Sequence, residues 1–189
     1  MLSKKIQKNL TDKVVKKVSR SIAADAKKTS KAINKATPMF VSALGRNVQR
    51  KSGARALSKA IREDHKGSGL KDLERRIDKI ERIEDGRKIT EHVFGREKRK
   101  TITALTAESG LDNSQIEKLL ASIAPVVLDQ LGKITTDGNF DVTQLTRLLT
   151  DEKRETDVAL GGLASLFDTN RNGTLLDEIW NFIKRLFGF

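Results

Sequence analysis

The sequence predicts an all-α protein, a multihelical bundle with helix-turn-helix-like elements preceded by a long basic helix. Apolar residues recur at intervals of three and four along most of the chain, and no segment shows the sustained alternation typical of a strand. Of the 189 residues, 37% are hydrophobic, which suffices for one core but leaves little room for a second large domain. We therefore expect one helical domain with an appendage.

The appendage is residues 1–35. Residues 3–35 contain neither Gly nor Pro, and their apolar residues recur every four positions, which predicts a single long helix. The apolar positions are Ile6, Leu10, Val14, Val18, Ile22 and Ala26. Eleven Lys and Arg against Asp12 and Asp25 make this helix basic, and a stripe that steps by four winds slowly around the helix. We expect a basic arm that projects from the domain at 36–189 or packs along it.

Pro and Gly divide the rest of the chain into shorter helices. Pro38 opens one helix, Asp85-Gly86 ends another, and Pro125 kinks a third before Gly132. The expected helices cover 38–50, 52–63, 70–83, 101–108, 113–131, 142–149, 158–167 and 175–187, with a short element at 88–94, a turn at 137–139 and an acidic run at 151–157.

The charge is distributed unevenly along the chain. The net charge is +12. Residues 1–100 carry 29 Lys and Arg against 12 Asp and Glu, whereas residues 101–189 carry 8 against 13. A basic surface of this strength is expected to face a polyanion, an anionic membrane, or the acidic half of another copy.

Several function classes are disfavoured by what the sequence lacks. Without cysteine there is no disulfide framework, thiolate zinc site or cysteine nucleophile. His65 and His92 have no second histidine at metal-binding spacing, and no GxGxxG, P-loop or GxSxG pattern is present. The first residues lack the apolar core of a signal peptide, and no apolar run has the length of a membrane span. We therefore expect a cytoplasmic, non-enzymatic protein.

Two patterns occur twice in the same order. ATPMFVSALG at 36–45 matches IAPVVLDQLG at 123–132, and KGSGLKDL at 66–73 matches NGTLLDEI at 172–179. Such recurrence indicates an internal duplication, which we place at 36–94 and 101–189.

Four segments carry a resemblance to a known family. They are ALGRN at 43–47, EHVFG at 91–95, SGLDNSQIEKLLASIAPVVLDQLGK at 109–133 and FDTNRNGTLLDEI at 167–179. In these segments the chain resembles the YidB-like bacterial family of domains of unknown function, DUF937, over roughly 36–189, with the basic arm outside. The resemblance implies a multihelical, homeodomain-like fold and no assigned activity.

The segment 103–123 fits the spacing of a helix-turn-helix. Gly110 would form the turn, and Asp112 with Gln115 forms a capping-box pattern. Leu111, Ile116 and Leu119 would lock the helices together, while Asn113, Ser114, Gln115 and Lys118 would face outward. Because Asp112 and Glu117 put negative charge where phosphates would lie, we favour a packed helix pair over a DNA reader.

The segment 168–179 is similar to a calcium loop. Asp168, Asn170, Asn172, Thr174 and Asp177 stand at ligand spacing around Gly173. The last position of an EF-hand loop requires a bidentate Glu and holds Ile179 here. Since the first copy of the pattern has Lys66 at a ligand position, we favour a structural turn over a calcium site. Calcium is the one cofactor that the sequence suggests.

The basic arm has several interpretations. It could neutralise phosphates along nucleic acid, lie on an anionic membrane, or pack as a solvated helix against the domain or another copy. Its composition is also similar to that of a transit peptide, although Lys greatly outnumbers Arg. The membrane interpretation is weaker because bulky anchors are absent before Phe40.

Our leading hypothesis is a binding or assembly protein whose arm contacts DNA without reading sequence, while the domain forms a homo-oligomer. The residues expected to bind nucleic acid are Lys4, Lys5, Lys8, Lys13, Lys16, Lys17, Arg20, Lys27, Lys28 and Lys31. The rival is a structural protein in which the arm of one copy docks on the acidic half of the next. No small-molecule substrate is expected.

Overall fold

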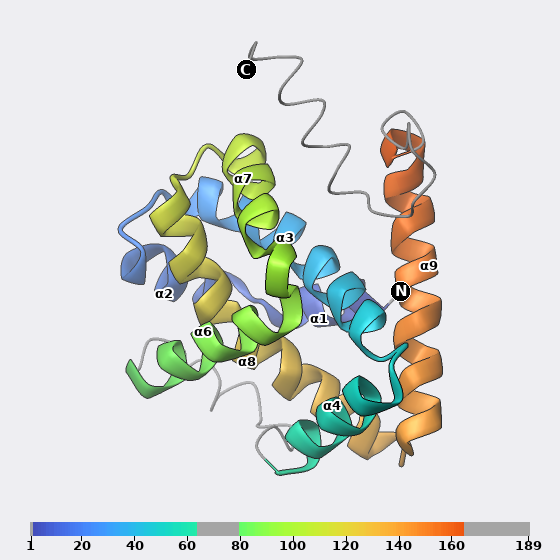
Figure 1. Ribbon diagram of the computed structural model, residues 1–189. Helices are drawn as coiled ribbons and strands as arrows, with labels where there is room; N and C mark the ends of the chain where they lie inside the picture. Colours follow the sequence, from blue (N-terminus) through green and yellow to red (C-terminus); the bar gives the residue numbers. More distant parts are fainter. Residues whose placement is uncertain (1, 64–79, 165–189) are drawn as a thin grey trace.

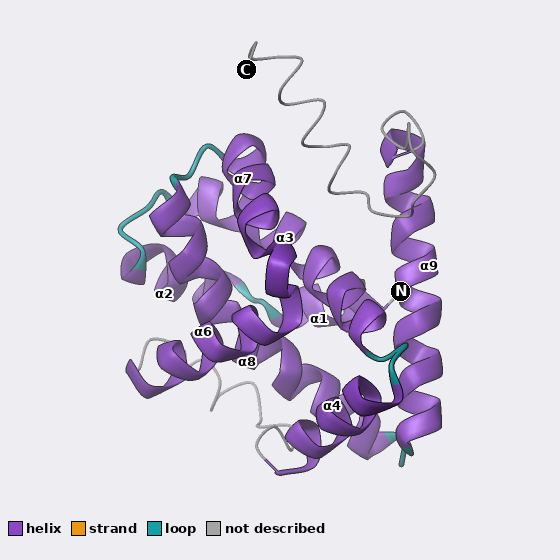
Figure 2. Cartoon of the chain, viewed as in Figure 1, coloured by secondary structure: helices purple, strands orange, loops and turns teal. Residues whose placement is uncertain are grey.

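A computed structural model describes residues 2–63 and 80–164, and in that part of the chain every element of secondary structure is a helix, joined to the next by a short loop or turn (Figures 1 and 2). The predicted all-α multihelical fold is confirmed. The helices are α1 (Leu2–Asn9), α2 (Asp12–Ser21), α3 (Ala26–Asn47), α4 (Lys51–Glu63), α6 (Ile80–Phe94), α7 (Lys98–Ser109), α8 (Asn113–Asp137) and α9 (Val142–Ala164), with a 3₁₀ turn η1 (Gly95–Glu97) between α6 and α7. The predicted calcium loop and the predicted helix at 175–187 lie outside the described residues.

The prediction of one helix over 3–35 is wrong, because side-chain caps divide this segment into α1, α2 and the first half of α3. The Thr11 hydroxyl accepts a hydrogen bond from the Val14 amide at the start of α2. The Asp25 carboxylate accepts from the amides of Lys27 and Lys28, each at 2.9 Å, at the start of α3. Short polar side chains satisfy the free amides of a helix start in this way, so they favour a break without any Gly or Pro.

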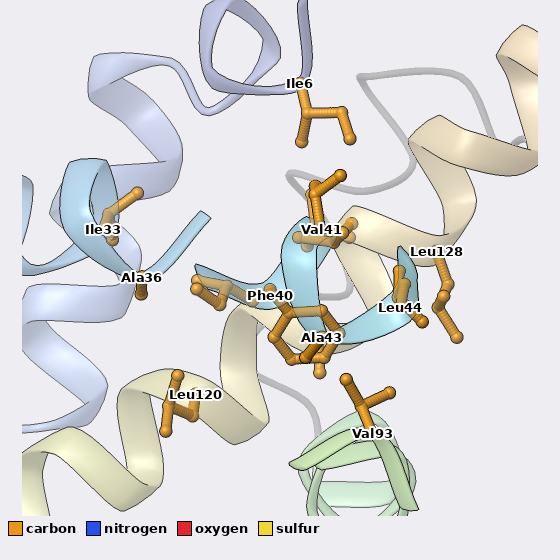
Figure 3. Close-up of a cluster of buried hydrophobic side chains, with 14 of the residues drawn as sticks. Ile6, Ile33, Ala36, Phe40, Val41, Ala43, Leu44, Val93, Leu120 and Leu128 are labelled. Carbon is orange, nitrogen blue, oxygen red and sulfur yellow. The ribbon is translucent and has the colours of Figure 1, made fainter. Parts of the chain in front are cut away.

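The arm is not a projecting rod. Of the apolar stripe predicted along it, all residues except the exposed Ala26 are buried, and Ile6, Val14 and Val18 are almost completely excluded from solvent. These side chains belong to the same core cluster as Phe40 and Leu120. Figure 3 shows Ile6 pointing toward Val41 of α3 within that cluster. The boundary we expected at residue 36 falls inside α3, so the arm and the domain share one core.

Pro38 lies inside α3, although we predicted that it opens a helix. A proline within a helix has no amide for the carbonyl four residues earlier, and that carbonyl needs another donor. Here the Gln7 side-chain amide of α1 donates to the Asn34 carbonyl at 2.8 Å. Contact with α1 thus helps α3 to continue through its proline.

Pro125 lies inside α8 in the same manner, and α8 continues past Gly132 to Asp137. The carbonyl that Pro125 leaves without its helical donor is that of Ala121, and Gly86 of α6 packs directly on it. Gly86 therefore does not end a helix as predicted. It lies within α6, where the absence of a Cβ allows close approach of the two backbones.

The turn predicted at 137–139 is confirmed, since Gly138 caps α8 and Asn139 has a φ of 50°. Residues 142–149 and 158–164, predicted to belong to two separate helices, instead form part of one helix, α9, which contains the acidic run. This helix packs against α3 at Gly45, where a Cβ would lie 2.6 Å from the Leu149 carbonyl oxygen. Phe40 and Phe94 meet edge to face near the centre of the core, with ring centroids 5.1 Å apart.

Glu152 of α9 fastens the start of α1. Its carboxylate accepts hydrogen bonds from the amides of Leu2 and Ser3, the latter at 2.8 Å, and from the Ser3 hydroxyl at 2.6 Å. Only 4% of Glu152 is exposed. The first amides of a helix have no acceptor within the helix. A carboxylate placed there accepts their hydrogen bonds, and its negative charge interacts favourably with the positive end of the helix dipole.

Replacing Glu152 by alanine is expected to lower the free energy of unfolding by about 2 kcal/mol, because buried donors would lose their acceptor. Denaturant unfolding of the full chain measures the change. Asp151→Ala is the matched control, since the neighbouring Asp151 is exposed. Equal losses in the two variants would show that the carboxylate does not hold α1.

Candidate nucleic-acid interface

The residues predicted to bind nucleic acid line the outward side of α1, α2 and the start of α3, opposite the buried stripe. We call these ten residues the basic face: Lys4, Lys5, Lys8, Lys13, Lys16, Lys17, Arg20, Lys27, Lys28 and Lys31. Nine are exposed, and Lys17 is partly buried. Amphipathic helices whose apolar sides enter the core necessarily present these charges to solvent.

Carboxylates among the described residues do not neutralise most of the basic face. Within the part of the chain that the structure describes, no ion pair is formed by Lys4, Lys5, Lys8, Lys16, Arg20, Lys27 or Lys31. The nearby Lys35, which is not in the predicted set, pairs with Glu108 at 3.2 Å.

The turn between α7 and α8 has the predicted local geometry. Gly110 adopts a left-handed conformation with φ of 71° and caps α7. The Asp112 carboxylate accepts from the Gln115 amide at 2.8 Å, while the Gln115 side chain accepts from the Asp112 amide, which completes the capping box. Leu111 and Ile116 are buried as expected.

The side chains predicted to face outward from this turn are partly engaged within the protein. The side-chain nitrogen of Gln115, Nε2, donates to the carbonyls of Ile22 and Ala23, at 3.4 and 3.1 Å. Thr106 donates to the Asn113 side chain at 2.9 Å. Ser114 and Lys118 remain exposed. The Gln115 side chain therefore holds the turn between α2 and α3 instead of facing outward.

The turn between α2 and α3 has the same construction as the turn between α7 and α8. Ala23 has a φ of 50° where the second turn has Gly110, and Asp25 caps α3 as Asp112 caps α8. The spacing from Asp25 to Asp112 also separates Pro38 from Pro125. Nothing in the sequence around Ala23 signals a left-handed residue, so sequence reasoning missed this turn.

The contacts between the two turns are reciprocal. Lys28 is the third residue of α3, and its ammonium group donates to the Gly110 carbonyl at 3.3 Å. Gln115 is the third residue of α8, and its side chain donates to the Ala23 carbonyl. The first turn of each long helix thus contains a side chain that donates a hydrogen bond to the carbonyl of the left-handed residue in the other turn.

The same spacing aligns the buried positions of α3 and α8. Residues at corresponding positions are buried in both helices: Thr29 and Ile116, Ala32 and Leu119, Ile33 and Leu120, Ala36 and Ile123, Thr37 and Ala124, Phe40 and Val127, Val41 and Leu128, Leu44 and Leu131, Gly45 and Gly132. In α2 and α7, Val14 corresponds to Thr101, Val15 to Ile102 and Val18 to Leu105, and all six are buried. We call residues 2–48 the first unit and residues 89–135 the second unit.

The two units differ sharply in charge. The first unit contains twelve Lys and Arg against two Asp and Glu, whereas the second contains six of each. Part of the basic charge of the second unit is also paired, since Lys98 lies 2.5 Å from Glu91 and Lys100 lies 3.6 Å from Glu97. The excess of positive charge therefore belongs to the first unit.

The structure adds no support for the predicted calcium site, whose residues it does not describe. Among residues 2–63 and 80–164, no three His, Cys, Asp or Glu residues are grouped so that they could hold a metal ion. Asp168, Asn170, Asn172, Thr174 and Asp177 lie outside the described residues, as does His65. His92 is exposed on α6. Within the described helices, none combines the length and apolarity that crossing a membrane requires.

The sequence matches a known family. The sequence model of the family described as "Bacterial protein of unknown function (DUF937)" matches residues 4–134. This range begins within α1 and ends near the end of α8, so it includes the arm that we had placed outside the resemblance. No curated protein and no solved structure matches the chain.

Proposed function

Because this chain belongs to the DUF937 family, whose description states no function, we propose one from its own residues: it binds duplex DNA through the basic face, without reading sequence. The observation that carries the proposal is a set of outward lysines, mostly without carboxylate partners among the described residues, on helices whose other side is fixed in the core. Lysines held in this way can neutralise phosphates and release the counterions condensed on DNA.

A membrane surface is less well supported as the ligand. Amphipathic helices bind membranes by inserting their apolar side between lipids. The apolar side of α1 and α2 is buried in the core, and Phe40, the first aromatic residue, is fully buried. Membrane insertion would therefore require these helices to leave the fold.

Sequence-specific reading by the α7–α8 turn is also less well supported. Gln115 already binds backbone carbonyls of the α2–α3 turn, and the Asp112 carboxylate stands at the start of α8. Base readout requires free polar side chains in a groove, next to groups that tolerate phosphate. The proposal is accordingly one of phosphate binding.

The test is a titration of full-length protein into two short duplexes of unrelated sequence. Both duplexes are expected to bind equally, and the affinity is expected to fall roughly a thousandfold between about 50 and about 200 mM salt if six or more phosphates are contacted. Fluorescence anisotropy measures both quantities. Absence of binding at the lower salt concentration would overturn the proposal, as would binding to anionic vesicles but not to DNA.

Light scattering on the same samples addresses the rival assembly hypothesis. A protein that oligomerises through its basic face should lose subunits when salt screens the charges. If added salt dissociates the oligomer and the protein does not bind DNA, the basic face binds another copy of the chain instead.

A further inference from the structure

We infer that the first and second units are two copies of one folding unit, and that Lys16, Arg20 and Lys27, which are basic in the first copy but not in the second, are contacts with the polyanion. The second part of this inference rests on the proposed function. It divides the basic face into residues that the shared fold carries in both copies and residues that only the first copy carries.

The two units are alike both in the order of their backbone elements and in the hydrogen bonds that each makes with the other. Both contain a helix, a left-handed residue, an Asp cap and a long helix with an internal proline, all at one constant spacing. The reciprocal bonds from Lys28 to Gly110 and from Gln115 to Ala23 are those expected when two like units pack about an approximate two-fold axis. The family match over 4–134 spans nearly both units.

The second copy shows which charges the shared fold does not need. It forms the same elements with Thr103, Ala107 and Ser114 at the positions that hold Lys16, Arg20 and Lys27 in the first copy. Lys13 and Lys31, by contrast, correspond to Lys100 and Lys118, so these two lysines occur in both copies.

Clustered like charges repel one another and oppose the compact state, so residues that the fold does not require need another reason to be basic. Binding of a polyanion supplies that reason, because phosphates neutralise the cluster. Lys16, Arg20 and Lys27 are therefore assigned as phosphate contacts.

The experiment replaces each of the three residues by its counterpart, giving the full-length triple variant Lys16→Thr, Arg20→Ala and Lys27→Ser. The control triple variant removes the same charge from the exposed surface of α4 by Lys51→Ala, Arg55→Ala and Arg62→Ala. The first variant is expected to bind duplex DNA at least about tenfold more weakly than the control, with a salt slope lower by about 3. Its melting temperature should match that of the unmodified protein or exceed it.

Each outcome has a distinct meaning. Equal weakening in both triple variants would overturn the assignment of these contacts while leaving the proposed function intact, because DNA binding then depends on total charge. Failure of the unmodified protein to bind would overturn both. A large drop in the melting temperature of the counterpart variant would contradict the two-copy interpretation, because residues suited to the second copy would then not fit the first.

Discussion

Replacing Gly86 by alanine is expected to lower the free energy of unfolding by roughly 2–3 kcal/mol, because the added methyl group would overlap the Ala121 carbonyl oxygen of α8. Helix propensity acts in the opposite direction, since alanine is favoured over glycine in a helix interior by about 1 kcal/mol. The overlap prevails because it involves backbone in the middle of a long buried helix, which cannot move aside as a flexible side chain can. Denaturant unfolding of the full chain measures the change.

The matched control is Asp85→Ala, at the exposed neighbouring position of α6. It is expected to change the stability by no more than about 0.5 kcal/mol. If Gly86→Ala were neutral or stabilising, α6 and α8 would not pack as closely as the structure shows.

Replacing Asp129 by alanine is expected to destabilise the protein by about 3 kcal/mol, because it leaves a largely buried arginine without its carboxylate. Asp129 of α8 pairs with Arg82 of α6, and their side chains are only 1% and 12% exposed. Removing one partner of a buried pair leaves the other charge desolvated, and that penalty exceeds the net worth of the pair itself. Urea denaturation gives the difference in free energy.

Two comparisons identify the source of this loss. Asp137→Ala breaks the exposed pair of Lys133 and Asp137 and is expected to cost less than about 1 kcal/mol. The double variant Arg82→Met and Asp129→Leu should recover much of the stability lost in Asp129→Ala, since apolar side chains can replace a buried ion pair. A double variant less stable than the single one would show that Asp129 acts mainly through partners other than Arg82.

The sequence predicted the helical class and the features set by local chemistry. The Asp112–Gln115 capping box and the Gly110 turn depend on neighbouring residues alone, and both are present as predicted. Two helix ends placed at Pro38 and Gly86 were wrong because tertiary contacts override the local preference. Gln7 supplies the hydrogen bond that Pro38 removes, and Gly86 is placed for contact with another helix.

The ten residues of the basic face were chosen from the sequence and their role in binding stays a prediction, whereas the packing of their helices into the core was not predicted. Periodicity identified the apolar stripe but could not tell whether it faces its own core, another copy or a membrane. The break at Ala23 escaped notice because an alanine in the left-handed region has no sequence signature. The spacing that relates Pro38 to Pro125 was visible in the sequence, and extending it toward the N-terminus would have included the arm in the repeat.

The hydrogen bonds from Leu2 and Ser3 to Glu152 close the described chain into a ring, because they tie its first helix to its last. Fraying of α1 therefore has to begin by breaking a contact with α9, and loosening of α9 exposes the start of α1. A fragment cut after residue 134, where the family match ends, would retain the first unit and all but the last residue of the second, but it would lose the hydrogen bonds to Glu152 and the helix that covers Gly45. The basic face and the glutamate that holds the start of its first helix thus lie at opposite ends of the described sequence.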